Sequence, residues 1–327
     1  MLYESLVKGL THKLNPIKYA LLTILASRQH ANIDLSIEFL DEAKVRLESY
    51  KDAVYLCRIA QAEKKLNLGL HHDCLQILNE VKGQVEADSD IDPKVYANLS
   101  EVFANYYRRK EDQENFYKSS LQFLAYTPAN ELSAEDKKQW SIKMGMAVLL
   151  GKNIFNIAEL LDKEILNSLV GSDFQWLYDL LMTLGRGQIT EFTAAIQKYQ
   201  DFVSRFPAIM KEMSYLDQKV RILAFLELLF NCGKDERCLT FTQLAAHCKV
   251  QVNEVEMLVM KAMSLELVRG SIDEVDQTVQ IDWIMPRYLS MDHLAVLVTR
   301  MDEWDVKMEN IIRTVENGSA EIIQDAI

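Results

Sequence analysis

The fold is decided near the C-terminal end of the chain, where residues 258–283 read LVMKAMSLELVRGSIDEVDQTVQIDW. The first part of this stretch has the apolar spacing of a helix. In the last part Val279, Ile281 and Trp283 alternate with polar residues, which is the pattern of a half-buried strand. The stretch therefore predicts a helix that leads into a two-stranded hairpin.

The elements around this hairpin complete a small module. In chain order the sequence predicts a helix, a short strand, two helices and two strands, over residues 217–230, 238–239, 241–248, 253–267, 268–275 and 278–285. Capping-box patterns open the two middle helices, with Thr240 and Gln243 at the first and Asn253 and Glu256 at the second. Helix, strand, helix, helix and hairpin is the order of a winged helix.

The first two thirds of the chain read as stacked helical hairpins. Over residues 2–206 the apolar spacing is helical almost throughout, with later helices predicted at 95–107, 116–124, 140–150, 154–161, 174–184 and 189–199. Short polar or glycine turns near Gly69, Lys110, Gly151 and Gly187 recur about every 36–41 residues. This interval is typical of helix-pair solenoids, which present a long curved surface.

A long helix follows the module, with Ser290 as its predicted N-cap. Asp305 interrupts one flank of an apolar stripe that consists of Leu294, Leu297, Val298, Met301, Trp304, Met308, Ile311, Ile312 and Val315. A terminal helix that extends roughly 25 residues beyond a compact module has to bury such a stripe. Two alternatives are open: the helix folds back on the repeats, or it joins helices of other chains in a bundle.

Charge argues against nucleic acid as a partner. The 327-residue chain has a net charge of −12, and between Asp217 and Leu289 eight Lys or Arg stand against eleven Asp or Glu. Nucleic-acid affinity comes largely from cationic side chains that displace counterions. A DNA-reading winged helix presents its second helix to the major groove, and the outward positions there would carry Glu254, Met257 and Lys261. We therefore predict contacts with protein and none with nucleic acid.

No catalytic, cofactor or metal constellation is found in the sequence. The stretch Gly145–Asn153 has the glycines and lysine of a phosphate loop, but its spacer is one residue too long and Asn153 replaces the magnesium-binding hydroxyl. His247 and Cys248 lack the paired short spacings of a zinc site. The five cysteines are scattered among apolar neighbours, as in reduced intracellular proteins. We expect no cofactor, no small-molecule substrate and no membrane contact.

A helical-repeat array followed by a winged helix and a tail helix resembles the PCI-domain proteins. These are scaffold subunits of the proteasome lid, the COP9 signalosome and a translation initiation factor complex. The block VNEVEMLVMKAMSLELVRGSIDEVDQTVQIDWIMPR (Val252–Arg287) is very similar to a lid branch of this family, and LYESL, HKLNP, Gly145–Leu161 and Phe174–Leu181 fit the same branch. Family members usually carry further helices ahead of the segment with which this chain begins, so we expect the outermost repeats to be missing.

The resemblance implies a mainly α fold. It consists of an α-solenoid of helical-hairpin repeats over residues 1–208, the winged-helix part of a PCI domain over 209–289 and a long C-terminal helix over 290–327. It also implies a non-catalytic scaffold that joins other PCI subunits of the lid within the proteasome regulatory particle, in cytoplasm and nucleus. The alternative is a scaffold subunit of another PCI complex.

Winged helices of this family pack side by side, and an exposed strand edge offers unpaired backbone N–H and C=O groups. We therefore expect the interface to include both hairpin strands, the outward face of 253–267 and the apolar stripe. For Val279, Ile281 and Trp283 the competing interpretation is domain core. The predicted interface residues are Glu254, Met257, Lys261, Ile272, Asp273, Val279, Ile281, Trp283, Leu294, Leu297, Met301, Trp304, Met308 and Ile312.

Overall fold

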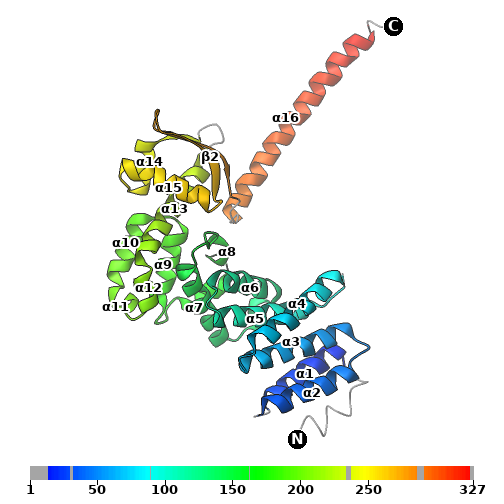
Figure 1. Ribbon diagram of the computed structural model, residues 1–327. Coiled ribbons are helices and arrows are strands. Elements are labelled where there is room, and N and C mark those ends of the chain that lie inside the picture. The colour runs from blue at the N-terminus through cyan, green and yellow to red at the C-terminus, as the bar shows by residue number, and fades with distance from the viewer. Residues whose placement is uncertain are drawn as a thin grey trace. The chain divides into compact units, whose positions relative to one another are not determined.

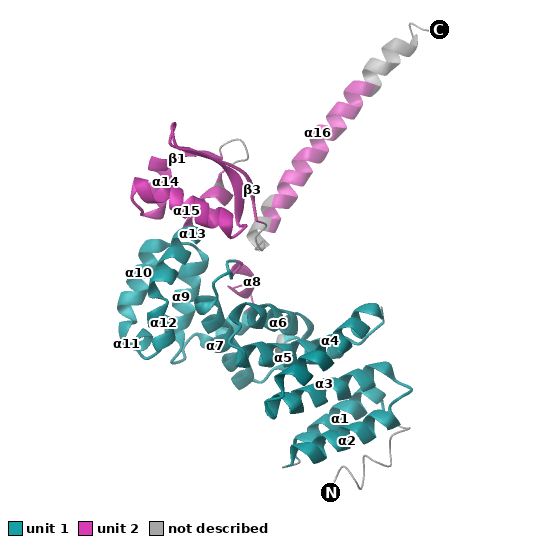
Figure 2. Ribbon diagram, in the orientation of Figure 1, with its two compact units in different colours: residues 1–155, 164–223 teal, residues 156–163, 224–327 magenta. Residues whose placement is uncertain are grey.

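The structure is a computed structural model that describes residues 14–29, 32–88, 90–161, 163–232, 237–285 and 291–324. The chain divides into two compact units, which are coloured separately in Figure 2. Unit 1 comprises residues 1–155 and 164–223, and unit 2 comprises residues 156–163 and 224–327. The domain boundaries expected after residues 208 and 289 follow the order of the elements and stay a prediction.

Unit 1 is built from helices (Figure 1). Its α-helices are α1 (Pro16–Arg28), α2 (Ile33–Arg46), α3 (Lys51–Asn67), α4 (His71–Ala87), α5 (Pro93–Arg109), α6 (Gln113–Tyr126), α7 (Ala134–Leu150), α9 (Gln175–Gly185), α10 (Ile189–Lys198), α11 (Gln200–Val203) and α12 (Pro207–Lys211). The 3₁₀ helices η2 (Ala129–Glu131) and η3 (Glu164–Leu169) lie in the connections between them. Helix α13 (Met213–Asn231) begins in unit 1 and ends in unit 2.

Local chemistry explains where several of these helices begin. Asn15 stands before Pro16, and its side-chain oxygen accepts a hydrogen bond of 2.9 Å from the Ile17 N–H. Asp92 stands before Pro93 and accepts from the Lys94 N–H at 2.8 Å. In both cases the cap satisfies a backbone donor that the first turn leaves unpaired, while the proline contributes no such donor.

Three helical hairpins, α3–α4, α5–α6 and α9–α10, share one turn. Each turns through a residue in the left-handed backbone region, with φ of 82° at Gly69, 59° at Glu111 and 64° at Gly187. The next N–H then donates to the carbonyl five residues earlier, from Leu70 to Lys65, Asp112 to Tyr107 and Gln188 to Thr183. At these turns the predicted repeat is therefore also a repeat of backbone geometry.

The connection at Gly151 differs from these turns, and the helix predicted over 154–161 is wrong for residues 154–157. The chain after α7 is non-helical until α8 (Ala158–Leu161), and Gly151 has an extended backbone with φ −74° and ψ 126°. A Cβ on Gly151 would lie 2.3 Å from Ile154 Cδ1 and 2.8 Å from the Ala147 carbonyl oxygen. The loop packs so closely on the end of α7 that only glycine fits.

Lys219 of α13 satisfies the carbonyls at the end of α7. Its side chain is 0% exposed, and its Nζ donates to the carbonyl oxygens of Val148 at 2.6 Å and Gly151 at 2.7 Å. The last carbonyls of a helix lack donors within the helix, so the buried amine supplies them. Burial lowers the pKa of Lys219 from 10.5 to about 7, and the Glu114 carboxylate opposes this shift.

Unit 2 contains the winged helix and the long terminal helix. The winged helix consists of the end of α13, β1 (Cys238–Thr240), α14 (Phe241–Cys248), α15 (Val252–Ser264), β2 (Val268–Asp273) and β3 (Thr278–Ile284). Its strands form an antiparallel sheet in the order β1-β3-β2. Thr240 and Gln243 form the predicted capping box of α14. The mainly α fold class is thereby confirmed, and α16 (Met291–Gln324) is the predicted terminal helix.

Candidate protein interface

The outward face of α15 carries a mixture of charged and apolar side chains. Val255, Val259 and Ala262 are fully buried on the opposite face. Glu254 and Lys261 are exposed, and Met257 is 64% exposed. These three side chains therefore lie at the surface, where the sequence placed them.

Helix α15 begins earlier than its predicted cap. The helix begins at Val252, and the Glu254 carboxylate accepts a hydrogen bond of 3.2 Å from the backbone N–H of Gln251. The cap predicted from Asn253 and Glu256 is therefore wrong by two residues. Because Glu254 caps the N-terminus of α15, its substitution would alter this end of the helix as well as the surface charge.

The wing is a tight turn that Asp273 organises. The Asp273 carboxylate accepts hydrogen bonds of 3.0 Å from the N–H groups of both Val275 and Asp276, and Gln277 adopts a left-handed backbone with φ 49°. At the tip the Val275 side chain is 92% exposed. The sequence pattern predicts the end of a strand at Val275, and so it does not identify this exposed side chain at the tip.

A β-bulge at Asp282 turns Trp283 to the outer face of the sheet. Arg269 pairs with Trp283, but the next residue, Gly270, pairs with Ile281, so Asp282 is an extra residue on β3. Ile281 is 3% exposed, whereas Trp283 is 37% exposed, and the Arg269 guanidinium lies 4.9 Å from the centroid of the Trp283 ring. The expected inward alternation of Val279, Ile281 and Trp283 is therefore wrong at its last member.

Gly270 allows this bulge to form. A Cβ at Gly270 would lie 2.0 Å from the Gln280 carbonyl oxygen and 2.9 Å from Ile281 Cα. Both neighbours are backbone atoms, which cannot move aside as a flexible side chain can. The position therefore requires glycine because the two strands approach each other too closely for any side chain.

The sheet order decides which edge is free. β3 lies between β1 and β2, so the expectation that both hairpin strands offer an edge is wrong for β3. Val279 and Ile281 are 1% and 3% exposed and belong to the core of the module, which corrects their assignment as interface side chains. Within the described residues, β2 has a strand on one side only, and its Ile272 is half-buried.

Helix α16 carries an exposed apolar stripe. From Leu294 to Val315 the stripe alternates spacings of three and four residues, which is the heptad pattern of a helix that packs against other helices. The exposed fractions of these side chains lie between 37% and 64% for Leu294, Leu297, Val298, Met301, Trp304, Met308, Ile311, Ile312 and Val315. Val306 is 59% exposed but lies outside the heptad stripe.

The structure accounts for the motifs that imitate chemical sites. Gly145 lies inside α7, where a Cβ would be 2.9 Å from Leu181 Cδ1, so this glycine serves the packing of α7 on α9. Burial raises the pKa of the Cys57 thiol to about 12 and that of Cys74 to about 11, as expected for cysteines of a hydrophobic core. In the described part of the chain, no three His, Cys, Asp or Glu side chains gather as a metal site requires. None of the described helices is long and apolar enough to cross a membrane.

Comparisons with known families agree with this architecture. A family model described as PSD13 N-terminal repeats matches residues 1–181, which is more than half of the chain. The chain belongs to this family. A second model, described as the PCI domain, matches residues 196–283 and so covers the winged helix.

The relatives extend the similarity over nearly the whole chain. The 26S proteasome non-ATPase regulatory subunit 13 homolog A of Arabidopsis thaliana is 28% identical over 326 residues, which cover 98% of this chain and 84% of that protein. The 26S proteasome non-ATPase regulatory subunit 13 of Dictyostelium discoideum is 29% identical over 324 residues, with 98% and 84% covered. This is the lid branch that the Val252–Arg287 block indicates.

The alternative PCI complex finds weaker support. Eukaryotic translation initiation factor 3 subunit M of Dictyostelium discoideum is 22% identical over 228 residues, which cover 69% of this chain and 53% of that protein. The similarity is both lower and shorter than that to the proteasome subunits.

Proposed function

We propose that this chain is a non-catalytic scaffold subunit of the 26S proteasome lid and acts in ATP- and ubiquitin-dependent protein degradation. Its role is to hold other lid subunits that contain PCI domains in place within the regulatory particle, in the cytoplasm and nucleus. It needs no cofactor for this role. The relatives named as 26S proteasome regulatory subunits support the assignment.

One observation carries the scaffold role: α16 exposes an apolar heptad stripe with Trp304 at 64% and Met301 at 60% exposure. Apolar side chains at this spacing stabilise a helix only when other helices cover them. A helical bundle shared with other subunits provides that cover. The outer face of the winged helix, with Met257 and Trp283, is the second proposed contact.

The assignment is tested by a double substitution on the stripe, Met301→Asp with Trp304→Asp. We expect incorporation into the lid, measured by native mass spectrometry of the purified assembly, to fall at least about tenfold. The reason is that a buried aromatic anchor typically contributes 2 kcal/mol or more to an interface. Identification of the co-purifying subunits in the same experiment separates the lid from other PCI complexes.

Val306→Asp is the matched control, because it introduces the same charge on the same helix at a similarly exposed residue outside the stripe. It is expected to leave incorporation unchanged. Normal incorporation of the double variant would refute the role of α16, and co-purification with initiation factor subunits would refute the lid assignment.

A further inference from the structure

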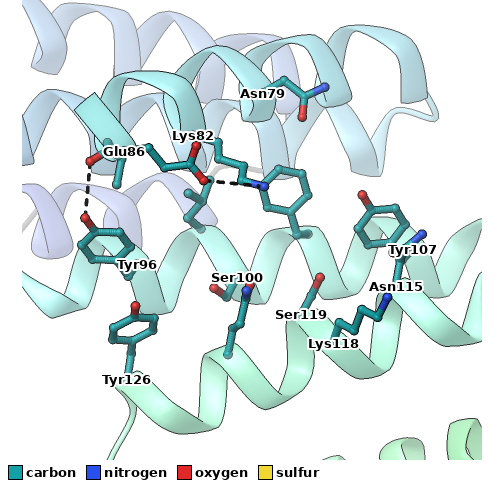
Figure 3. A pocket seen from close by; sticks show the side chains of 14 residues that line it. Asn79, Lys82, Glu86, Tyr96, Ser100, Tyr107, Asn115, Lys118, Ser119 and Tyr126 are labelled. Carbon is teal, nitrogen blue, oxygen red and sulfur yellow. Dashed lines mark hydrogen bonds and ion pairs between the residues drawn. The ribbon is translucent and has the colours of Figure 1, made fainter. Parts of the chain in front are cut away.

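Helices α4, α5 and α6 of unit 1 enclose a groove of about 440 Å³, seen from close by in Figure 3. The floor is one face of α5 between Tyr96 and Tyr107, and α4 and α6 form the walls. None of its lining residues belongs to the interface proposed above. Its volume lies within the range of sites that bind small molecules or a few peptide residues.

Two aromatic pairs lie at the ends of the groove. Tyr96 stacks on Tyr126 with ring centroids 5.1 Å apart, and Phe103 stacks on Tyr107 with centroids 6.1 Å apart. Tyr96 and Phe103 are separated by seven residues of α5, which is about 10 Å along a helix axis. Between them Ser100 and Ser119 are buried but small, and this leaves the space open.

The α6 wall repeats the same spacing with polar groups. Asn115 and Gln122 both line the groove and are also seven residues apart, so their amides are about 10 Å apart along the axis. A side-chain amide has two N–H donors and one carbonyl acceptor. One N–H of Asn115 already donates to the Asp112 carboxylate at 2.7 Å, and the other N–H and the carbonyl can bond to a peptide backbone. In a polyproline II segment residues three positions apart point to the same side and lie about 9 Å apart, so a peptide in this conformation would meet both amides and both aromatic pairs in one register.

The charges of the groove favour one sign of ligand. Three charged residues line it: Lys82 and Glu86 of α4, which form an ion pair of 3.7 Å, and Lys118 of α6. Lys118 is exposed, and within the described residues no ion pair neutralises it. The groove is thus locally cationic in a chain whose net charge is −12, and it would attract a carboxylate.

We propose that this groove binds a peptide segment of a partner protein in the polyproline II conformation, with an Asp or Glu beside Lys118 and apolar side chains three residues apart on the two aromatic pairs. The backbone of the segment would bond to Asn115 and Gln122. The proposal is independent of the assignment to the lid, because the two depend on different residues.

The test is selection of phage-displayed random heptapeptides on the full chain, followed by fluorescence polarisation with an enriched peptide and its Asp→Asn or Glu→Gln version. We expect enriched peptides to combine an acidic residue with apolar residues three positions apart. Neutralising the acid, or the variant Lys118→Glu, should weaken binding at least tenfold. The matched control Lys110→Glu, at the exposed turn of the same hairpin and outside the groove, should change affinity less than twofold.

Two results would overturn the proposal. The first is the absence of any peptide enriched above background. The second is an enriched peptide that binds Lys118→Glu and the groove-filling variant Ser119→Tyr as tightly as it binds the parent chain. Since Lys118 lies on the surface, loss of binding in Lys118→Glu with an unchanged circular dichroism spectrum is attributable to the groove.

Discussion

The two units depart from the usual distribution of polar and apolar side chains in opposite directions. Unit 1 encloses the amine of Lys219, which is 0% exposed, whereas unit 2 leaves the indole of Trp304 64% exposed. The buried amine bonds to two carbonyls of its own unit. A buried polar group that is hydrogen-bonded in this way stabilises the fold, whereas an exposed apolar stripe favours association with another protein.

Removal of the buried amine is expected to have the largest effect on stability. Lys219→Met keeps an unbranched apolar side chain, one atom shorter, but leaves the Val148 and Gly151 carbonyls without their donor. We expect the free energy of unfolding to fall by about 3 kcal/mol, because unsatisfied buried carbonyls cost about 1–3 kcal/mol each. Denaturant unfolding of the isolated chain measures this. The exposed neighbour Lys152→Met is the control and should change stability by less than about 0.5 kcal/mol; equal effects of both variants would contradict the role of Lys219.

A substitution at the β-bulge tests why the Trp283 side chain lies on the outer face of the sheet. Gly270→Ala introduces a Cβ 2.0 Å from the Gln280 carbonyl oxygen, so the β2–β3 pairing must shift. We expect a loss of about 2 kcal/mol in the stability of unit 2 and a change in the fluorescence of Trp283. Ser271→Ala, at an exposed neighbour on the same strand, should leave both unchanged. A Gly270→Ala variant with parental stability would show that the strand contact is looser than described.

The contribution of Lys219 to the free energy of unfolding should also depend on pH. The unfolded lysine keeps its proton up to about pH 10.5, whereas the native Lys219 loses it near a pKa of about 7. Between these values the unfolded chain binds more protons, so stability that depends on Lys219 rises with pH, by up to about 1.4 kcal/mol per pH unit. A neutral amine still has two N–H donors for the two carbonyls.

Denaturant unfolding of the parent and of Lys219→Met between about pH 7 and 9 measures this effect. The stability difference between the two proteins should widen as pH rises, because only the parent carries the titrating amine. A difference that stays constant or narrows would mean that the amine remains protonated in the native state.

The smallest effect is expected at the exposed stripe. Trp304→Asp should change the free energy of unfolding of the isolated chain by less than about 0.5 kcal/mol, since the indole is largely exposed before and after the change. Thermal unfolding followed by circular dichroism at 222 nm, alongside Val306→Asp, checks this. A large destabilisation by Trp304→Asp alone would mean that the stripe belongs to the core of this chain.

The sequence predicted most of the fold because its signals are local. The capping box at Thr240 and the left-handed turn at Gly69 each depend on a few adjacent residues. The wrong predictions concern positions whose structure depends on residues that are distant in the sequence. The outward turn of Trp283 depends on the pairing of Gly270 across the sheet, and the loop after α7 depends on Lys219 of α13. The lone lysine in the largely apolar helix α13 could have indicated that its amine bonds to this loop.

The candidate interface was predictable to a different extent. Periodicity alone identified the α16 stripe, because exposure of one helix face needs no knowledge of the rest of the chain. Side chains of the hairpin required the strand order, which placed β3 at the centre and buried Val279 and Ile281. The groove on α4, α5 and α6 was not predicted, since it takes shape only when three helices lie together.

The division into units has a consequence for synthesis on the ribosome. The chain passes between the units after residues 155, 163 and 223. Unit 1 is therefore incomplete until residue 223 has emerged. Residues 156–163 belong to the same unit as residues 224–327, which are translated more than sixty positions later. Most of the repeats can pack as they appear, but the segment after α7 stays exposed to chaperones and proteases for that interval. A ribosomal pause between residues 164 and 223 would lengthen this vulnerable period.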